Sequence, residues 1–145
     1  MKQKLIIISM FLAIIANSCK VTLVPNYDGA IATQIDNTLK LVDSFYLTML
    51  ETTENKNGGR AYSHFINSYI NIEIELQSLL DKNRVRPLNK NSIAICENTL
   101  KQFQKYKSQH KTDNQISDEN IILNRIYMHD QLVRMQMGEA FKPAN

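Results

Sequence analysis

The chain of 145 residues contains no tryptophan, four glycines, three prolines and two cysteines. With so few glycines it has neither a phosphate-binding glycine loop nor a Gly-x-Ser-x-Gly nucleophile elbow. Its three histidines, His64, His110 and His129, stand outside the HExxH, CxxC, CxxCH and Glu-x-x-His patterns of metal and haem sites. The spacing of serine, histidine and acidic residues neither excludes nor specifically supports a catalytic triad. We therefore expect a protein that is not an enzyme and that carries no cofactor.

The longest apolar run lies at the start of the chain, in residues 5–16, and is broken only by Ser9. A membrane-spanning helix needs about 20 apolar residues to cross roughly 30 Å of hydrocarbon, so this run is short for a span. Lys2 and Lys4 precede it, and small or polar residues follow it. This three-part layout is typical of a cleaved secretory signal.

The junction after the run, Ala16-Asn17-Ser18-Cys19, resembles the lipobox of bacterial lipoproteins, in which a small residue precedes an invariant cysteine. The resemblance covers residues 1–19 and implies that residues 1–18 are removed and that Cys19 receives a diacylglyceryl group. Ser18 fits this pattern, whereas the family usually has a larger aliphatic residue in the place of Ala16. Lys20 replaces the Asp that retains enteric lipoproteins in the inner membrane, which implies the outer membrane of a Gram-negative bacterium.

Two other fates of the N-terminus remain open. Ala16 and Ser18 also satisfy the small-x-small rule of ordinary secretory cleavage, and a retained N-terminal anchor is the third alternative. Two acyl chains give lasting membrane attachment, and an exported protein rarely leaves a terminal cysteine unpaired. We therefore favour a protein attached to the membrane through a lipid on Cys19. Cys96 occupies an apolar helical position, which predicts a buried thiol and not a reactive one.

After the signal, the sequence divides into a tether, residues 19–26, and a single helical domain, residues 27–145. Pro25 prevents a helix from starting inside the tether. The first helix is expected from Asp28 to about Asn55, before a turn at residues 57–59. Its apolar positions recur at intervals of four and three residues, as on the buried face of a helical bundle. These positions are Ile35, Leu39, Val42, Tyr46 and Met49.

The segment 60–83 is ambiguous between helix and strand. Residues 70–76 read INIEIEL, an alternation that also suits a half-buried strand. Helical spacing on both sides, over more than 20 residues without a breaker, favours a helix over an isolated strand. In such a helix Ile74 points away from the apolar face, where it is free to meet a partner.

Two more helices complete the domain. Arg86-Pro87 marks a break, and a third helix is expected over residues 91–110. Ser117 is a suitable cap for a fourth helix that ends near Phe141, with Ile116 and Ile121 placed for a hydrophobic staple. Four helices with short connections predict an all-α fold, an antiparallel up-down four-helix bundle.

Charge is nearly balanced but unevenly distributed. Without Lys2 and Lys4, the 17 basic residues become 15, against 14 acidic residues. Residues 82–111 contain eight basic residues and a single acid, Glu97. We expect this segment to contact anionic lipid headgroups or an acidic envelope protein. The alternative is a helix face that is merely solvated. Nucleic acid is not an expected partner. The candidate interaction patch is Lys101, Lys105, Lys107 and Lys111.

The fourth helix carries a polar seam, Arg125, His129 and Gln136, within the apolar stripe of that helix. Such a seam forms either a buried network with acids such as Glu73 or the lining of a groove.

Copper(I) is a sharper hypothesis for the same helix, because thioether and imidazole ligands suit this ion. The candidate ligands are Met128, His129, Met135 and Met137. Met135 and Met137 project roughly 160° apart on a helix, however, so core packing is preferred and no metal site is assigned.

The favoured function is a non-enzymatic interaction module in the bacterial cell envelope. The alternative is a small periplasmic carrier that holds a ligand or metal inside the bundle, with a cavity around His129.

Overall fold

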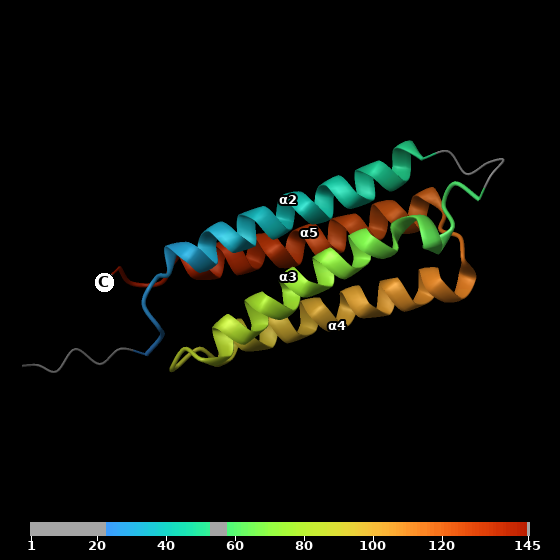
Figure 1. Ribbon diagram of the computed structural model, residues 1–145. Helices are drawn as coiled ribbons and strands as arrows, with labels where there is room; N and C mark the ends of the chain where they lie inside the picture. Colours follow the sequence, from blue (N-terminus) through green and yellow to red (C-terminus); the bar gives the residue numbers. More distant parts are fainter. Residues whose placement is uncertain (1–22, 53–57, 145) are drawn as a thin grey trace, which may run out of the picture.

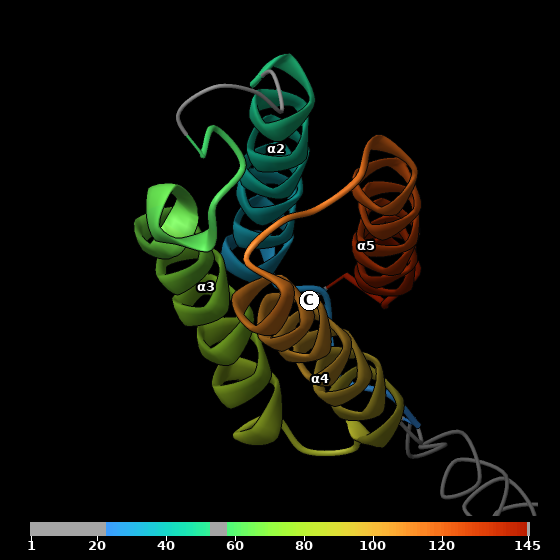
Figure 2. The same cartoon turned by 90° about the vertical axis from the view of Figure 1, so that its right-hand side faces the viewer.

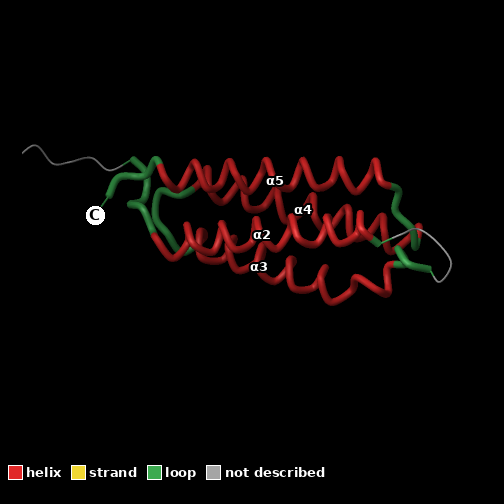
Figure 3. The backbone as a smooth tube through the Cα atoms, turned by 90° about the horizontal axis from the view of Figure 1, so that it is seen from above, coloured by secondary structure: helices red, strands yellow, loops and turns green. Residues whose placement is uncertain are grey.

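The computed structural model describes residues 23–52 and 58–144, in which four long helices run side by side in alternating directions (Figure 1). The helices are α2 (Gly29–Glu51), α3 (Ile66–Arg84), α4 (Lys90–Asp113) and α5 (Asp118–Ala140), and a short 3-10 helix, η1 (Tyr62–Phe65), precedes α3. They form a ring in which each helix packs against the next and α5 packs back against α2 (Figure 2). The connections lie at the two ends of the bundle (Figure 3). The predicted antiparallel up-down four-helix bundle is confirmed.

The helix boundaries follow from local capping. The Asp28 carboxylate accepts hydrogen bonds from the backbone N–H groups of Ala30 (2.9 Å) and Ile31 (3.2 Å), and Ser117 caps α5 through the N–H of Asn120 (3.3 Å). Asn114 ends α4 in the left-handed conformation, with φ of 53°, which asparagine tolerates well. The predicted signal (residues 1–18) and Cys19 lie outside the described residues. The first helix ends at Glu51 and not near Asn55, because Thr52 has extended backbone angles (φ −78°, ψ 107°).

The ambiguous segment is helical, as predicted from its length, but its start differs from the prediction. Ile72 and Leu76 are buried one turn apart, whereas Ile70 and Ile74 are exposed, which is the pattern of a helix and not of a strand. The α-helix starts at Ile66 and not near residue 60, because the preceding residues form η1 and because Phe65 has non-helical backbone angles (φ −115°, ψ 4°).

The core contains an aromatic cluster toward the end of the bundle that carries η1. His110 joins it as a buried polar member: its Nε2 lies 2.8 Å from the backbone oxygen of Arg60, and its Nδ1 lies 3.0 Å from the Tyr69 hydroxyl. A carbonyl can only accept, so Nε2 carries the proton and Nδ1 accepts from Tyr69. Burial lowers the pKa of His110, although the bond to Arg60 opposes this shift, and the imidazole is neutral at pH 7.

Tyr46, by contrast, is fully buried, and its hydroxyl has no hydrogen-bond partner within the described part of the chain. We therefore expect Tyr46→Phe to raise the free energy of unfolding by about 1 kcal/mol, since it removes a buried polar group that gains nothing. The matched change Tyr69→Phe should lower it by about 1–2 kcal/mol, because it leaves His110 Nδ1 without a donor. Urea unfolding followed by circular dichroism measures both. Equal losses in the two variants would contradict this assignment.

Candidate functional site

The polar seam of α5 meets an acid on α2. Arg125 Nε lies 2.9 Å from Asp43 Oδ1, and His129 Nδ1 lies 2.9 Å from Asp43 Oδ2. The predicted partner Glu73 is wrong, because α3 is not a neighbour of α5 in the ring. Gln136 is half-buried farther along α5 and takes no part in these contacts.

The seam lies at the surface where α2 and α5 pack. Arg125, His129 and Asp43 are all half-buried, whereas the core face of α5 is centred on Ile121, Met128 and Leu132. His129 therefore lies outside the bundle interior in which a carrier would hold its ligand. A partly exposed ion pair of this kind contributes little to stability, typically about 0–1 kcal/mol. The seam accordingly contributes little to holding the fold together.

An apolar surface continues from the seam along the outer side of α5. Four large apolar side chains are exposed within two turns of this helix, and one of them, Tyr127, also has an edge-to-face ring contact with Tyr106 of α4. We name them the α5 apolar patch: Ile122, Leu123, Ile126 and Tyr127.

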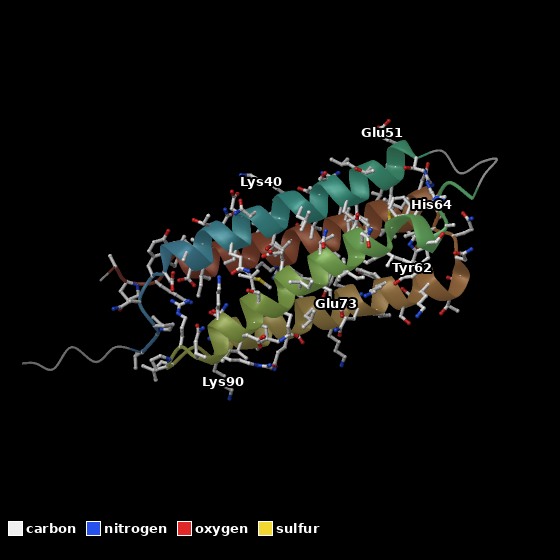
Figure 4. All side chains as sticks on the ribbon, viewed as in Figure 1. Lys40, Glu51, Tyr62, His64, Glu73 and Lys90 are labelled. Carbon is white, nitrogen blue, oxygen red and sulfur yellow. The ribbon has the colours of Figure 1, made fainter. Side chains whose placement is uncertain are left out.

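The four candidate lysines of α4 do not behave alike. Lys107 Nζ lies 2.6 Å from Glu73 Oε2, on the side of α3 that faces α4 (Figure 4). Burial alone would raise the pKa of Glu73, but hydrogen bonds from Lys107 and Gln104 hold it below the ordinary value. The other three lysines are exposed and make no ion pair within the described residues. They are Lys101, Lys105 and Lys111.

The sulfur-bearing side chains of α5 do not converge on one point. Met128 and Met135 are buried in the core, whereas Met137 is exposed. In the part of the chain that the structure describes, no three His, Cys, Asp or Glu side chains are arranged to hold a metal ion. An enclosed space beside Cys96 and Met135 measures about 20 Å³, enough for one water molecule and not for an organic ligand.

Cys96 is buried, as its position in the sequence predicted, and burial raises the pKa of its thiol to about 11. We expect iodoacetamide to leave Cys96 unmodified in the folded protein at neutral pH and to modify it fully in guanidinium chloride. Peptide mass spectrometry measures both reactions. Rapid alkylation of Cys96 without denaturant would contradict the buried, protonated thiol.

Residues 23–28, 84–90 and 139–144 lie together at one end of the bundle, which we name the tether end. A network of buried charges lies there. Glu139 at its centre is almost fully buried. Arg86 binds the two Glu139 carboxylate oxygens at 2.9 and 3.0 Å, Lys142 Nζ lies 2.6 Å from Oε2, and the N–H of Asp28 donates to Oε1 at 2.8 Å. Arg86 also donates to the backbone oxygen of Asn26. The network thus ties the first described residues to two distant parts of the chain.

The same network extends into the loop between α3 and α4. Lys142 Nζ lies 3.2 Å from Asn89 Oδ1, and Asn89 in turn donates to the side-chain and backbone oxygens of Asn83 (2.7 and 3.0 Å). Burial would raise the pKa of Glu139, but the hydrogen bonds from Arg86, Lys142 and the Asp28 N–H lower it below the ordinary 4.5. Glu139 is therefore ionised at pH 7.

The sequence contains one local signal of this network. Glu139 stands in the last turn of α5, where the helix dipole disfavours a negative charge. An acid in that place needs cationic partners. Neither partner was predicted: Lys142 stands only three residues after Glu139, whereas nothing in the local sequence connects Arg86 with Glu139.

Comparisons with known proteins return no match to a family model, a curated protein or a solved structure. No helix in the described residues is both long enough and apolar enough to cross a membrane.

Proposed function

We propose that this chain is a lipoprotein of the bacterial cell envelope, anchored in the membrane through Cys19, facing the periplasm and acting there as a non-enzymatic interaction module. The outer membrane of a Gram-negative bacterium is the expected location, and another envelope protein or anionic headgroups are the expected partners. The observation that carries the proposal is the sequence of residues 1–19, a short apolar signal that ends in a small residue and a cysteine.

The burial of the second cysteine, Cys96, supports a lipid on Cys19. Cys96 lies in the core and has almost no exposed surface, so it cannot pair with Cys19 unless the bundle opens. In an exported protein, a terminal cysteine without a disulfide partner is well explained by acylation.

The exposed surface supports an interaction role. The α5 apolar patch and the polar seam lie next to each other on one helix, which combines an apolar centre with charged groups at its rim. The exposed lysines of α4 are the second candidate face, suited to acidic groups or anionic lipid headgroups.

Membrane fractionation tests the anchor with the two cysteines as a matched pair. The unmodified chain and Cys96→Ala should remain in the membrane pellet after an alkaline carbonate wash, because acyl chains resist such a wash. Cys19→Ser should appear in the soluble periplasmic fraction. If Cys19→Ser stays in the washed pellet after residues 1–18 have been removed, as the mass of its N-terminal peptide reports, the lipid anchor is refuted.

Crosslinking in intact envelopes separates the two candidate faces. Leu123→Asp with Ile126→Asp places charge on the α5 apolar patch, and Lys101→Glu with Lys105→Glu reverses charge on α4 without touching the Lys107 pair with Glu73. Loss of a crosslinked species in one double variant assigns the contact to that face. A crosslinking pattern unchanged in both would remove support for an interaction module.

A further inference from the structure

The most exposed apolar side chains of the described residues gather at one end of the bundle. Val85 is 84% exposed, Phe141 83% and Leu23 79%, and all three belong to the tether end. At the opposite end, by contrast, Phe65 and Ile116 are buried. Single exposed apolar residues are common on protein surfaces, but the three most exposed ones coming together at one end call for an explanation.

The loop between α3 and α4 gives a second, independent observation. Leu88 has a φ of 58°, a left-handed conformation that costs about 1–2 kcal/mol for a residue with a side chain. Glycine or asparagine would relieve this cost, yet the chain places there a leucine that is 61% exposed. Backbone strain of this kind, where it presents an apolar side chain to the outside, is a reason to look for a contact at that place.

The path of the chain shows which surface would meet this end. The first described residues emerge at the tether end, beside the α3–α4 loop and the end of α5 (Figure 1). Hydrogen bonds hold them in place: Tyr27 N donates to Pro143 O at 2.8 Å, and Asp28 N donates to Glu139. Leu23 is the fourth residue after Cys19, so the two are at most about 14 Å apart along the chain.

We propose that the tether end docks on the lipid bilayer itself, with Val85, Leu88 and Phe141 entering the interface between headgroups and acyl chains. This inference rests on the proposed anchor at Cys19, since an anchor within about 14 Å of Leu23 keeps this end at the membrane. Lys90 projects from the same end, makes no ion pair within the described part of the chain and is placed to meet lipid phosphates (Figure 4).

Docking in this way fixes the orientation of the bundle. A helix of 19 residues such as α3 is about 29 Å long, so η1 at the far end stands well away from the lipid. The polar seam and the α5 apolar patch then face the periplasm, where another envelope protein can reach them.

The lack of tryptophan makes a direct test possible, because any tryptophan introduced is the only one in the chain. Phe141→Trp and Val85→Trp place a probe at the tether end, and Ser63→Trp places the matched control on η1 at the far end. The full chain is expressed in a Gram-negative host and purified in the form that the host makes. Each variant is mixed with vesicles of phosphatidylethanolamine and phosphatidylglycerol that carry brominated acyl chains, which quench tryptophan on contact.

We expect Phe141→Trp and Val85→Trp to lose most of their emission and to shift it to shorter wavelength, while Ser63→Trp keeps its emission. If Phe141→Trp and Ser63→Trp respond alike, whether both are quenched or both are not, the docking is refuted. Val85→Trp decides the matter if Phe141→Trp does not fold. The mass of the N-terminal peptide of the same samples reports the acyl group separately. An acylated protein without quenching refutes docking and leaves the anchor intact, whereas quenching without an acyl group supports docking and refutes the anchor.

Discussion

Replacement of Glu139 by alanine is expected to lower the free energy of unfolding by about 3–5 kcal/mol, the usual cost of removing one partner from a buried ion pair. The variant keeps Arg86 and Lys142 at the tether end and removes the carboxylate that both of them bind. Lys142 is buried, so its charge would lose its main compensation. The Asp28 N–H at the start of α2 would also lose its acceptor. Urea unfolding followed by circular dichroism measures the loss, which corresponds to a fall of roughly 10–20 °C in Tm.

Glu139→Gln separates charge from shape. The amide occupies the same space but carries no charge. We therefore expect Glu139→Gln to lower the free energy of unfolding at pH 7 by about 1–3 kcal/mol, less than Glu139→Ala. Because the pKa of Glu139 is lower in the folded protein than its ordinary 4.5, the stabilisation is present above that pH and is lost as pH falls below it. The difference between the unmodified chain and Glu139→Gln should therefore shrink on acidification below pH 4.5.

Asp36→Ala provides the control, since Asp36 pairs with Lys40 on the exposed side of α2. Such an exposed pair is worth at most about 0.5 kcal/mol, so this variant should unfold close to the unmodified protein. If Glu139→Ala were no more destabilised than Asp36→Ala, the network would not hold the tether end together.

Arg60 lies at the opposite end of the bundle. Its replacement by methionine should lower the free energy of unfolding by a similar amount, about 3–5 kcal/mol. The Arg60 side chain is buried, and its donors reach the last turn of α2: Nε lies 3.0 Å from Met49 O and 2.8 Å from Thr52 O, and Nη2 lies 3.2 Å from Leu50 O. These carbonyls have no partner inside the helix, so Arg60 caps the C-terminus of α2 with a charge that also suits its dipole.

The same guanidinium group connects α2 with the start of α5. Its Nη1 pairs with the Asp118 carboxylate and lies 3.5 Å from the backbone oxygen of Ile116. Methionine fills a similar volume but donates no hydrogen bond. The backbone oxygens at the end of α2 would therefore lose the donor that Arg60 provides. Arg60→Lys should recover part of the loss, since one ammonium group cannot reproduce the fork of the guanidinium.

Arg134→Ala on the exposed side of α5 is the matched control for the loss of an arginine, and it should change the unfolding free energy by less than about 0.5 kcal/mol. Urea unfolding of Arg60→Met, Arg60→Lys and Arg134→Ala in parallel gives the comparison. Equal stability of Arg60→Met and Arg134→Ala would show that the α2 cap contributes nothing.

The helices could be predicted from the sequence because their signals are local. Apolar spacing placed the buried residues Val42, Tyr46 and Met49, and Ser117 marked the start of α5 through its own side chain. Length resolved the alternating segment of α3 correctly.

The buried networks could not be predicted in this way, because most of their contacts join residues far apart in the chain; the pairing of Glu139 with Lys142 is the local exception. Arg60 reads in the sequence as the end of a glycine turn, and Glu139 as one more helix-surface acid. Only the closing of the ring brings α5 against α2, and this gives Arg125 and His129 the partner Asp43 in place of Glu73. Likewise, it is the pairing of Lys107 with Glu73 that sets this lysine apart from its neighbours on α4.

The Glu139 network also bears on the proposed role of the protein. By holding residues 26–28 against α5, it fixes the point at which the chain leaves the bundle. In this account the network gives the anchored bundle a defined orientation, in which the α5 apolar patch lies toward the end of the bundle that is farther from the lipid.

The most direct test of the account is the mass of the N-terminal peptide of the protein isolated from the membrane fraction of its native host. We expect a peptide that begins at Cys19 and carries the mass of a diacylglyceryl group. A peptide that begins at Cys19 without lipid, or one that retains residues 1–18, would contradict the lipid anchor on which the proposed function depends.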